Sequence, residues 1–291
     1  NPSNNFFVWT IPTQNTPAPT PTPTVTDFVE FTYTDSRLNA IVTETKNIFR
    51  SILTSNNINT PYNISLYLSD LEAGVLGQAS WGSREIWLNS SNLDDTSTFK
   101  MNDQVVNLNV PVLFHETLHV LGLVGLSPLI SQYVNGNNDN PPNVYSGPNG
   151  VTQYKNLLSA NGFNTTGIMY VPMEDDYGGG TAMSHFEEGE NWIDSNNDGV
   201  PQNSEITDET RIINNITYPV LRNEIMTGFL NLQDNYITPM VIGLLEDLGF
   251  GVNYNSDYVV TSGEQFEWIP NTSSSIQRST SSKKIRHKCR I

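Results

Sequence analysis

The sequence has one cysteine, Cys289, and few basic residues. A single cysteine excludes an intrachain disulfide, so the fold has to be held by a buried core. The 14 lysines and arginines stand against 30 acidic residues, which gives a formal net charge of −16. Six of the basic residues fall in positions 278–291, a segment without any acid. The strongly acidic remainder disfavours binding of nucleic acid or of an anionic membrane.

The sequence also lacks an uninterrupted apolar run long enough for a transmembrane helix. Its most apolar stretch, residues 110–130, carries His115, Glu116 and His119 near the middle and contains prolines and glycines. A charge at the centre of a bilayer helix costs about 2.5–3.5 kcal/mol on insertion scales. We therefore expect a buried helix followed by a turn, and no transmembrane segment.

The composition is that of a globular protein, with 37% hydrophobic and 10% aromatic residues. Residues 11–25 are rich in proline and threonine, a composition typical of an extended arm that buries little. We expect three regions: an arm or linker over 1–27, one globular domain over 28–262, and a flexible basic tail over 263–291. The tail could bind an acidic surface or stay disordered, and the sequence leaves both open.

Apolar spacing predicts an α+β domain. The pattern over 36–54 has helical periodicity, whereas 63–71, 76–80 and 84–90 are short strand candidates bounded by turn residues. Three further helices are expected. One begins near Pro111 and ends at Gly122, one covers about 150–159, and one follows Thr238 and ends before Gly249.

The helix near Pro111 contains the sequence HETLH, which is a candidate zinc site. Residues four apart lie on the same face of a helix, so His115 and His119 can offer ring nitrogens to one ion. Glu116 points to a different side and can instead take a proton from a water that the zinc activates. The competing interpretation, two core histidines beside an exposed glutamate, would leave a buried charged cluster uncompensated.

A catalytic zinc usually has three protein ligands and one open position. The compact pattern HExxHxxGxxH would place the third histidine at position 125, where this chain has Gly125. A glutamate on a following helix is another common solution. The remaining histidines are His185 and His287, of which His287 lies in the basic tail and is a poor candidate.

Several blocks of the sequence resemble the leishmanolysin-like metalloproteases, which are metzincins with a long insertion before the third histidine. The chain is most similar to the cysteine-free bacterial-type members. The blocks appear in the family's order over about residues 30–260. They are HETLHVLG (115–122), VYSGPNGVTQYKNLL (144–158), VPMEDDYGGGTAMSHF (171–186), NEIMTGFLN (223–231) and MVIGLLEDLGFGVNY (240–254).

This resemblance implies a metzincin-type fold with a mixed sheet and a zinc helix in an upper part, residues 28–122. The lower part, residues 123–262, would contain the insertion, the third ligand and the Met-turn. His115, His119 and His185 would bind Zn²⁺, Glu116 would be the general base, and Met226 would lie beneath the metal. The activity implied is that of an endopeptidase acting on proteins or peptides. Its substrate would pair with an edge strand at 75–80, including Gly77, Gln78 and Ala79.

Residues 194–205 match the pattern D-x-N-x-D-G-x5-E of calcium-binding loops. The candidate ligands are the side chains of Asp194, Asn196, Asp198 and Glu205 and the carbonyl of Val200. Pro201 is unusual in such a loop, and no flanking helix pair is evident. A turn rich in Asn and Asp is the equally plausible alternative, so Ca²⁺ is a possible second cofactor.

Two other classes of function remain open. The chain could be a catalytically silent protein with a metzincin-like fold, although an intact Glu116 argues against this. It could also be a calcium-dependent adhesion module. Five N-x-S/T sequons permit glycosylation, and we expect a secreted protein or one at the surface of a cell or particle. The oligomeric state cannot be read from these residues.

Overall fold

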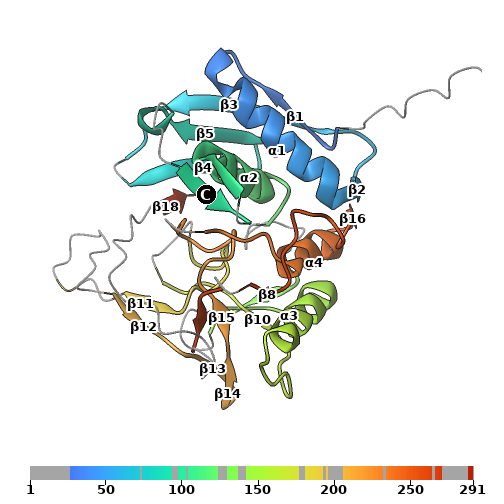
Figure 1. Cartoon of the computed structure of the whole chain (residues 1–291), viewed down its shortest axis with the longest axis vertical. Helices are drawn as coiled ribbons and strands as arrows, with labels where there is room; N and C mark the ends of the chain where they lie inside the picture. The colour runs from blue at the N-terminus through green and yellow to red at the C-terminus, as the bar shows by residue number, and fades with distance from the viewer. Residues whose placement is uncertain are drawn as a thin grey trace, which may run out of the picture.

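The computed structural model describes residues 27–72, 74–93, 98–102, 104–123, 130–136, 142–176, 181–192, 195, 206–231, 234–263, 266–270 and 288–290. In these residues the chain has an α+β fold with four α-helices, as the apolar spacing predicted. Figure 1 shows one large sheet with α1 and α2 in the upper half, and α3, α4 and several small sheets below. The predicted arm lies almost wholly outside the described residues.

The upper half is built on a mixed five-stranded sheet in the order β1-β3-β5-β4-β18. β1, β3 and β5 are parallel, β4 is antiparallel to β5, and β18 runs parallel to β4. The bounds are β1 (Val29–Thr32), β3 (Tyr62–Ser69), β4 (Val75–Ser80), β5 (Glu85–Asn89) and β18 (Lys288–Arg290). The strands predicted over 63–71, 76–80 and 84–90 are thus confirmed as β3, β4 and β5.

Helices α1 (Asn39–Ile52) and α2 (Asn109–Val120) pack together beside this sheet. α1 is amphipathic and buries one face, whereas every residue of α2 is buried, including its polar residues His115, Glu116 and His119. The rings of Phe49 and Phe114 join the two helices with centroids 4.9 Å apart. α2 also contacts β4 and β5, so the predicted zinc helix packs against these two strands of the sheet.

Short elements complete the upper half. They are the 3₁₀ turns η1 (Ser36–Leu38) and η2 (Ser90–Asn92), strand β2 (Leu53–Ser55), and the hairpin β6 (Thr98–Met101) and β7 (Gln104–Asn107). β2 pairs with β16 (Gly251–Val252), which follows the last helix of the lower half. This pairing ties the two halves together.

The lower half contains α3 (Pro148–Ala160) and α4 (Pro239–Asp247), which pack closely. A Cβ on Gly243 would lie 2.8 Å from the carbonyl oxygen of Asn149, so only glycine allows this approach. Asp247 accepts hydrogen bonds of 2.9 Å from the backbone N–H groups of Asn149 and Gly150. A carboxylate of α4 therefore caps the positive end of α3.

The remaining strands of the lower half form small sheets. They are β8 (Val134–Asn135), β9 (Val144–Tyr145), β10 (Val171–Pro172), β11 (Glu190–Trp192), β12 (Ile206–Asp208), β13 (Arg211–Ile213), β14 (Ile216–Tyr218), β15 (Val220–Leu221) and β17 (Trp268–Ile269). β10, β9 and β8 form an antiparallel three-stranded sheet, and β15 pairs with β17.

Within residues 263–291, the region predicted to be a flexible tail, the structure describes two short strands. Trp268 and Ile269 form β17 and are 6% and 8% exposed, so the packed domain extends beyond residue 262. This strand could not be predicted from the sequence because its apolar residues follow no periodic pattern. Lys288–Arg290 form β18 and pair with β4, whereas residues 271–287 lie outside the described part.

No helix among the described residues is long and apolar enough to cross a membrane. The apolar stretch 110–130 instead contains α2, which ends at Val120, and its residues 124–129 lie outside the described part.

Candidate metal centre

Helix α2 places His115 and His119 on one face, and the turn that ends the helix completes the surroundings of His119. Gly122 has a φ of 114°, a left-handed conformation that favours glycine. The N–H of Gly122 bonds to the carbonyl of His119, and the N–H of Leu123 bonds to that of Leu118. This reversal brings the Leu123 carbonyl oxygen to 2.7 Å from His119 Nδ1.

His185 comes from the lower half, 66 positions after His119, and its segment is fixed by backbone hydrogen bonds on both sides. The carbonyl of His185 accepts from Glu174 N–H at 3.0 Å, and Phe186 N–H donates to the Met226 carbonyl at 2.9 Å. Phe186 thus bridges Met173 on one side and Thr227 on the other. These short ladders carry the third histidine toward α2.

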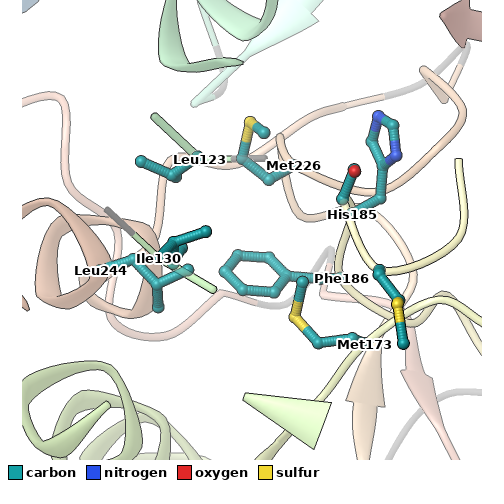
Figure 2. A pocket seen from close by; sticks show the side chains of 9 residues that line it. Leu123, Ile130, Met173, His185, Phe186, Met226 and Leu244 are labelled. Carbon is teal, nitrogen blue, oxygen red and sulfur yellow. The ribbon is translucent and has the colours of Figure 1, made fainter. Parts of the chain in front are cut away.

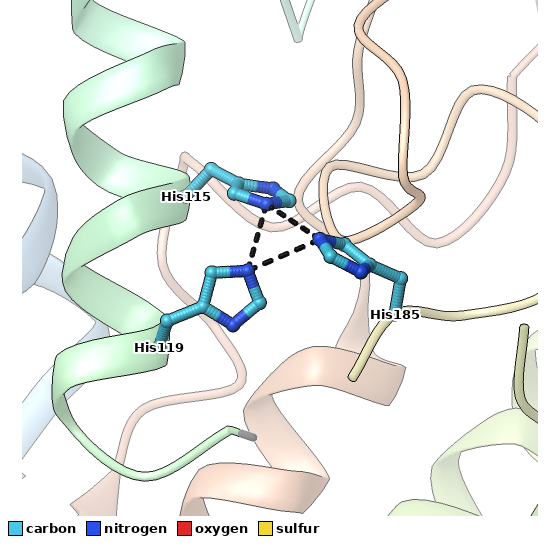
Figure 3. Close-up of side chains that lie close together, drawn as sticks. All are labelled: His115, His119 and His185. Atoms are coloured by element: carbon cyan, nitrogen blue, oxygen red, sulfur yellow. Dashed lines mark hydrogen bonds between the residues drawn. The ribbon is translucent and has the colours of Figure 1, made fainter. Parts of the chain in front are cut away.

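The three histidine rings converge, as Figure 3 shows. The Nε2 atoms are 2.9 Å apart between His115 and His119, and 3.1 Å apart for each of these with His185. All three residues are buried, with at most 1% of their surface exposed. The structure therefore brings together the three residues predicted as zinc ligands, in a cluster able to hold a metal ion.

The second nitrogen of each ring identifies the tautomer. Nδ1 of His115 lies 2.7 Å from the Ile225 carbonyl oxygen, Nδ1 of His119 contacts Leu123 O, and Nδ1 of His185 lies 2.9 Å from Thr181 O. A carbonyl oxygen only accepts, so each Nδ1 carries the proton. In the neutral rings each Nε2 is then a lone-pair acceptor, and three lone pairs point at one another.

Protonation of the rings does not relieve the repulsion between these three lone pairs. Burial lowers the pKa of His115 to about 4, and burial together with the neighbouring His115 and His185 lowers the pKa of His119 well below its usual value. Neutral imidazoles are the form that binds metals. Three nitrogens at about 2.0–2.1 Å from a tetrahedral ion would be roughly 3.3–3.4 Å apart, a few tenths of an ångström wider than observed. The cluster thus fits a tetrahedral ion with a small outward shift.

Glu116 lies between the two helical ligands and faces the sheet. It is fully buried, and a Cβ added to Gly77 of β4 would come within 2.8 Å of its Oε1 atom. The Glu116 carboxylate is therefore in direct contact with the backbone of β4. Gly77, predicted to belong to a substrate-binding strand, does lie beside the predicted general base.

The prediction that β4 is a free edge strand is wrong in this structure. Gly77, Gln78 and Ala79 pair on one side with β5, and on the other side Gly77 and Gln78 pair with Cys289 and Arg290 of β18. An edge strand presents unpaired N–H and C=O groups that attract any extended chain. Here the tail of the same chain takes that position.

The predicted Met-turn supports the histidine cluster through backbone carbonyls as well as through the side chain of Met226. The side chain of Met226 is 2% exposed and lines the same largely apolar pocket as His185 (Figure 2). The preceding carbonyl, of Ile225, accepts from His115, and the Met226 carbonyl accepts from Phe186. One turn thus supports two of the three histidines.

Two buried glutamates that the sequence did not single out brace this turn. Glu224 accepts from Met226 N–H and from the Thr238 hydroxyl at 3.1 Å, and Glu188 accepts from Gly228 N–H at 2.9 Å. Burial raises the pKa of Glu224 to about 8, against the opposing effect of these donors. The sequence shows that Glu224 lies two residues before Met226. It does not show that the Glu224 side chain points into the protein.

The candidate ligands of the predicted calcium loop all lie outside the described residues: Asp194, Asn196, Asp198, Val200 and Glu205. A different acidic group lies close to His185. It comprises the buried residues Glu174, Asp175, Glu187 and Glu188. Burial raises the pKa of Glu174 well above its usual value, and the Glu187 and Glu188 carboxylates raise it further.

Comparison with known proteins adds no relative: no family model matches the chain, and a search of curated proteins found no match. The site is therefore defined by its own geometry.

Proposed function

We propose that this chain is a zinc-dependent endopeptidase of the metzincin type. One observation carries the proposal: three buried histidines, two from α2 and one from the lower half, direct unprotonated Nε2 atoms to a common point. Nitrogen donors in this number and spacing suit Zn²⁺, which commonly has three protein ligands in catalytic sites. The order of HETLH, His185 and Met226 along the chain supports the metzincin assignment.

A zinc ion held there would polarise a peptide carbonyl and lower the pKa of a nearby water. The chain's own residues would move the proton and hold the histidine rings in place. Glu116 accepts the proton of the attacking water and returns it to the departing amine. The carbonyls of Ile225, Leu123 and Thr181 keep the three rings in the tautomer that leaves Nε2 free for the metal.

The outer side of β4 is the proposed place for the substrate backbone. Gly77 brings this strand against Glu116, so a peptide paired with β4 would pass close to the general base. Main-chain hydrogen bonds to a strand hold an extended peptide largely irrespective of its side chains. Because β18 pairs with β4 here, a substrate has to displace the tail strand.

The test is a comparison of three proteins by zinc analysis and by cleavage of casein or a fluorogenic peptide. Wild type should contain one zinc per chain and cleave. Glu116→Gln keeps the shape of the side chain, so it should retain zinc and lose at least 10²-fold in kcat. Glu72→Gln, at an exposed position, is the matched control and should behave as wild type. A zinc-loaded, folded wild type that cleaves none of these substrates would favour a catalytically silent protein.

A further inference from the structure

A second group of metal-ligand side chains lies apart from the histidine cluster. Glu174 and Asp175 follow β10 after one intervening residue, Met173, and Glu187 comes two residues after His185. Carboxylate oxygens of these three residues lie within 4.8 Å of one another. The residues are 0%, 6% and 2% exposed, so water does not solvate their charges. Such a group needs compensation from within the protein.

Arg211 supplies part of that compensation. Its guanidinium donates to both oxygens of Asp175 at 2.5 Å and also contacts the Glu187 carboxylate. Gly189 N–H donates to the other Glu187 oxygen at 2.8 Å. Three carboxylates against one guanidinium still leave an excess of negative charge. Glu188, whose carboxylate accepts from Gly228 N–H, adds to that excess.

Glu174 is the member that the arginine does not reach. Its Oε1 atom accepts from Asp176 N–H at 2.7 Å, but among the described residues nothing donates to its buried Oε2 atom. A fully buried carboxylate oxygen without a donor is costly unless a cation binds it. One carboxylate oxygen of Glu174 lies within 4.8 Å of those of Asp175 and Glu187, so the close group includes a side chain whose charge Arg211 does not balance.

We propose that Glu174, Asp175 and Glu187 hold a calcium ion. The donors are all oxygens, which hard divalent cations prefer over the nitrogen ligands that suit zinc. Calcium takes six to eight oxygens at about 2.3–2.6 Å in flexible geometry, so two oxygens bound to one ion can lie up to about 5.2 Å apart, and the three carboxylates satisfy this bound. Magnesium demands near-ideal octahedral geometry and usually keeps several waters, which a fully buried group of carboxylates does not favour.

The position gives the ion a structural role at the metal centre. Glu174 N–H bonds to the carbonyl of His185, and Glu187 N–H bonds to the carbonyl of Pro172. An ion shared by Glu174 and Glu187 therefore links the segment that follows β10 to the segment that carries His185. The site is distinct from the calcium-like loop 194–205, whose candidate ligands are different residues.

Calcium titration of the full-length, zinc-saturated protein tests this site. Isothermal calorimetry should show one calcium per chain in wild type, and calcium should raise the unfolding temperature of wild type. Glu174→Gln should weaken calcium binding at least tenfold and remove the calcium-dependent rise in unfolding temperature. Without calcium this variant should be no less stable than wild type, because it removes a buried like charge. Asp198→Asn, in the loop, is the control and should keep the binding at Glu174.

Three results would overturn the proposal. Wild type could bind no calcium at millimolar concentration, which would mean that Arg211 and bound protons neutralise the three carboxylates without a metal ion. Glu174→Gln could bind calcium as tightly as wild type. Terbium bound to wild-type crystals, located by anomalous diffraction, could lie in the 194–205 loop and not beside Glu174. The terbium position decides the question even if the variant does not fold.

Discussion

Gly77 is the position where a single methyl group should damage the site most selectively. A Cβ there would lie 2.8 Å from Glu116 Oε1 and 2.8 Å from Val112 Cγ1, whereas ordinary contacts begin near 3.4 Å. Gly77 has no left-handed φ, so Gly77→Ala strains packing and not the backbone. Either β4 or Glu116 has to move by roughly 0.6 Å, and overpacking of this kind costs about 1–3 kcal/mol.

The expected catalytic loss follows from the same displacement. A misplacement of about 1 Å in a catalytic group can cost 10²-fold in rate, so we expect kcat of Gly77→Ala to fall by roughly 10- to 100-fold. Zinc content should not change, because the three atoms nearest to the new methyl group belong to Glu116 and Val112 and not to a histidine. Cleavage of a fluorogenic peptide, zinc analysis and urea unfolding measure the three quantities.

Gly82→Ala is the matched control, since a Cβ at this position has no atom within 4 Å. It should leave kcat and stability close to those of wild type. If Gly77→Ala instead cleaves as fast as wild type while remaining folded and zinc-loaded, Glu116 does not depend on its contact with β4. The placement of the general base argued above would then be wrong.

Two further predictions concern the tail and the Met-turn. Cys289→Pro removes a backbone N–H opposite Gly77, so it should raise kcat/KM several-fold for peptides long enough to pair with β4. Cys289→Ser keeps this N–H and should not raise kcat/KM. Equal rates in both variants would show that β18 does not compete with substrate. The pKa of Glu224 is raised from 4.5 to about 8, so the folded state holds the proton of this carboxyl more tightly than the unfolded state does. The bound proton stabilises the fold fully below pH 4.5, and this stabilisation is lost as pH rises through 8. The stability of Glu224→Gln relative to wild type should therefore increase by up to a few kcal/mol between pH 5 and 8 in urea titrations, and a constant difference would mean that the donors to Glu224 outweigh its burial.

Much of the fold could be predicted from periodicity. The alternation over 63–71 gave β3, the helical spacing over 36–54 gave α1, and glycine and proline marked both ends of α2. The short strands of the lower half, mostly two or three residues long, could not be found in this way. Such strands have no measurable period, and they form because distant backbone segments supply their hydrogen-bond partners.

The histidine cluster was predictable only in part from residue chemistry. The pair in α2 follows from helix geometry, but the choice of His185 as its partner rested on a resemblance and is now supported by the converging rings. The carbonyls that orient the rings could not be predicted, because every residue has a carbonyl and only the folded chain selects Ile225, Leu123 and Thr181. The tail strand on β4 was missed since its three residues show no strand pattern.

Anomalous diffraction at the zinc absorption edge, from crystals of the purified protein, tests the central claim most directly. We expect one peak about 2.0–2.1 Å from the Nε2 atoms of His115, His119 and His185. A peak bound by only two of these rings, or rings that turn away from one another with no ion between them, would contradict the account.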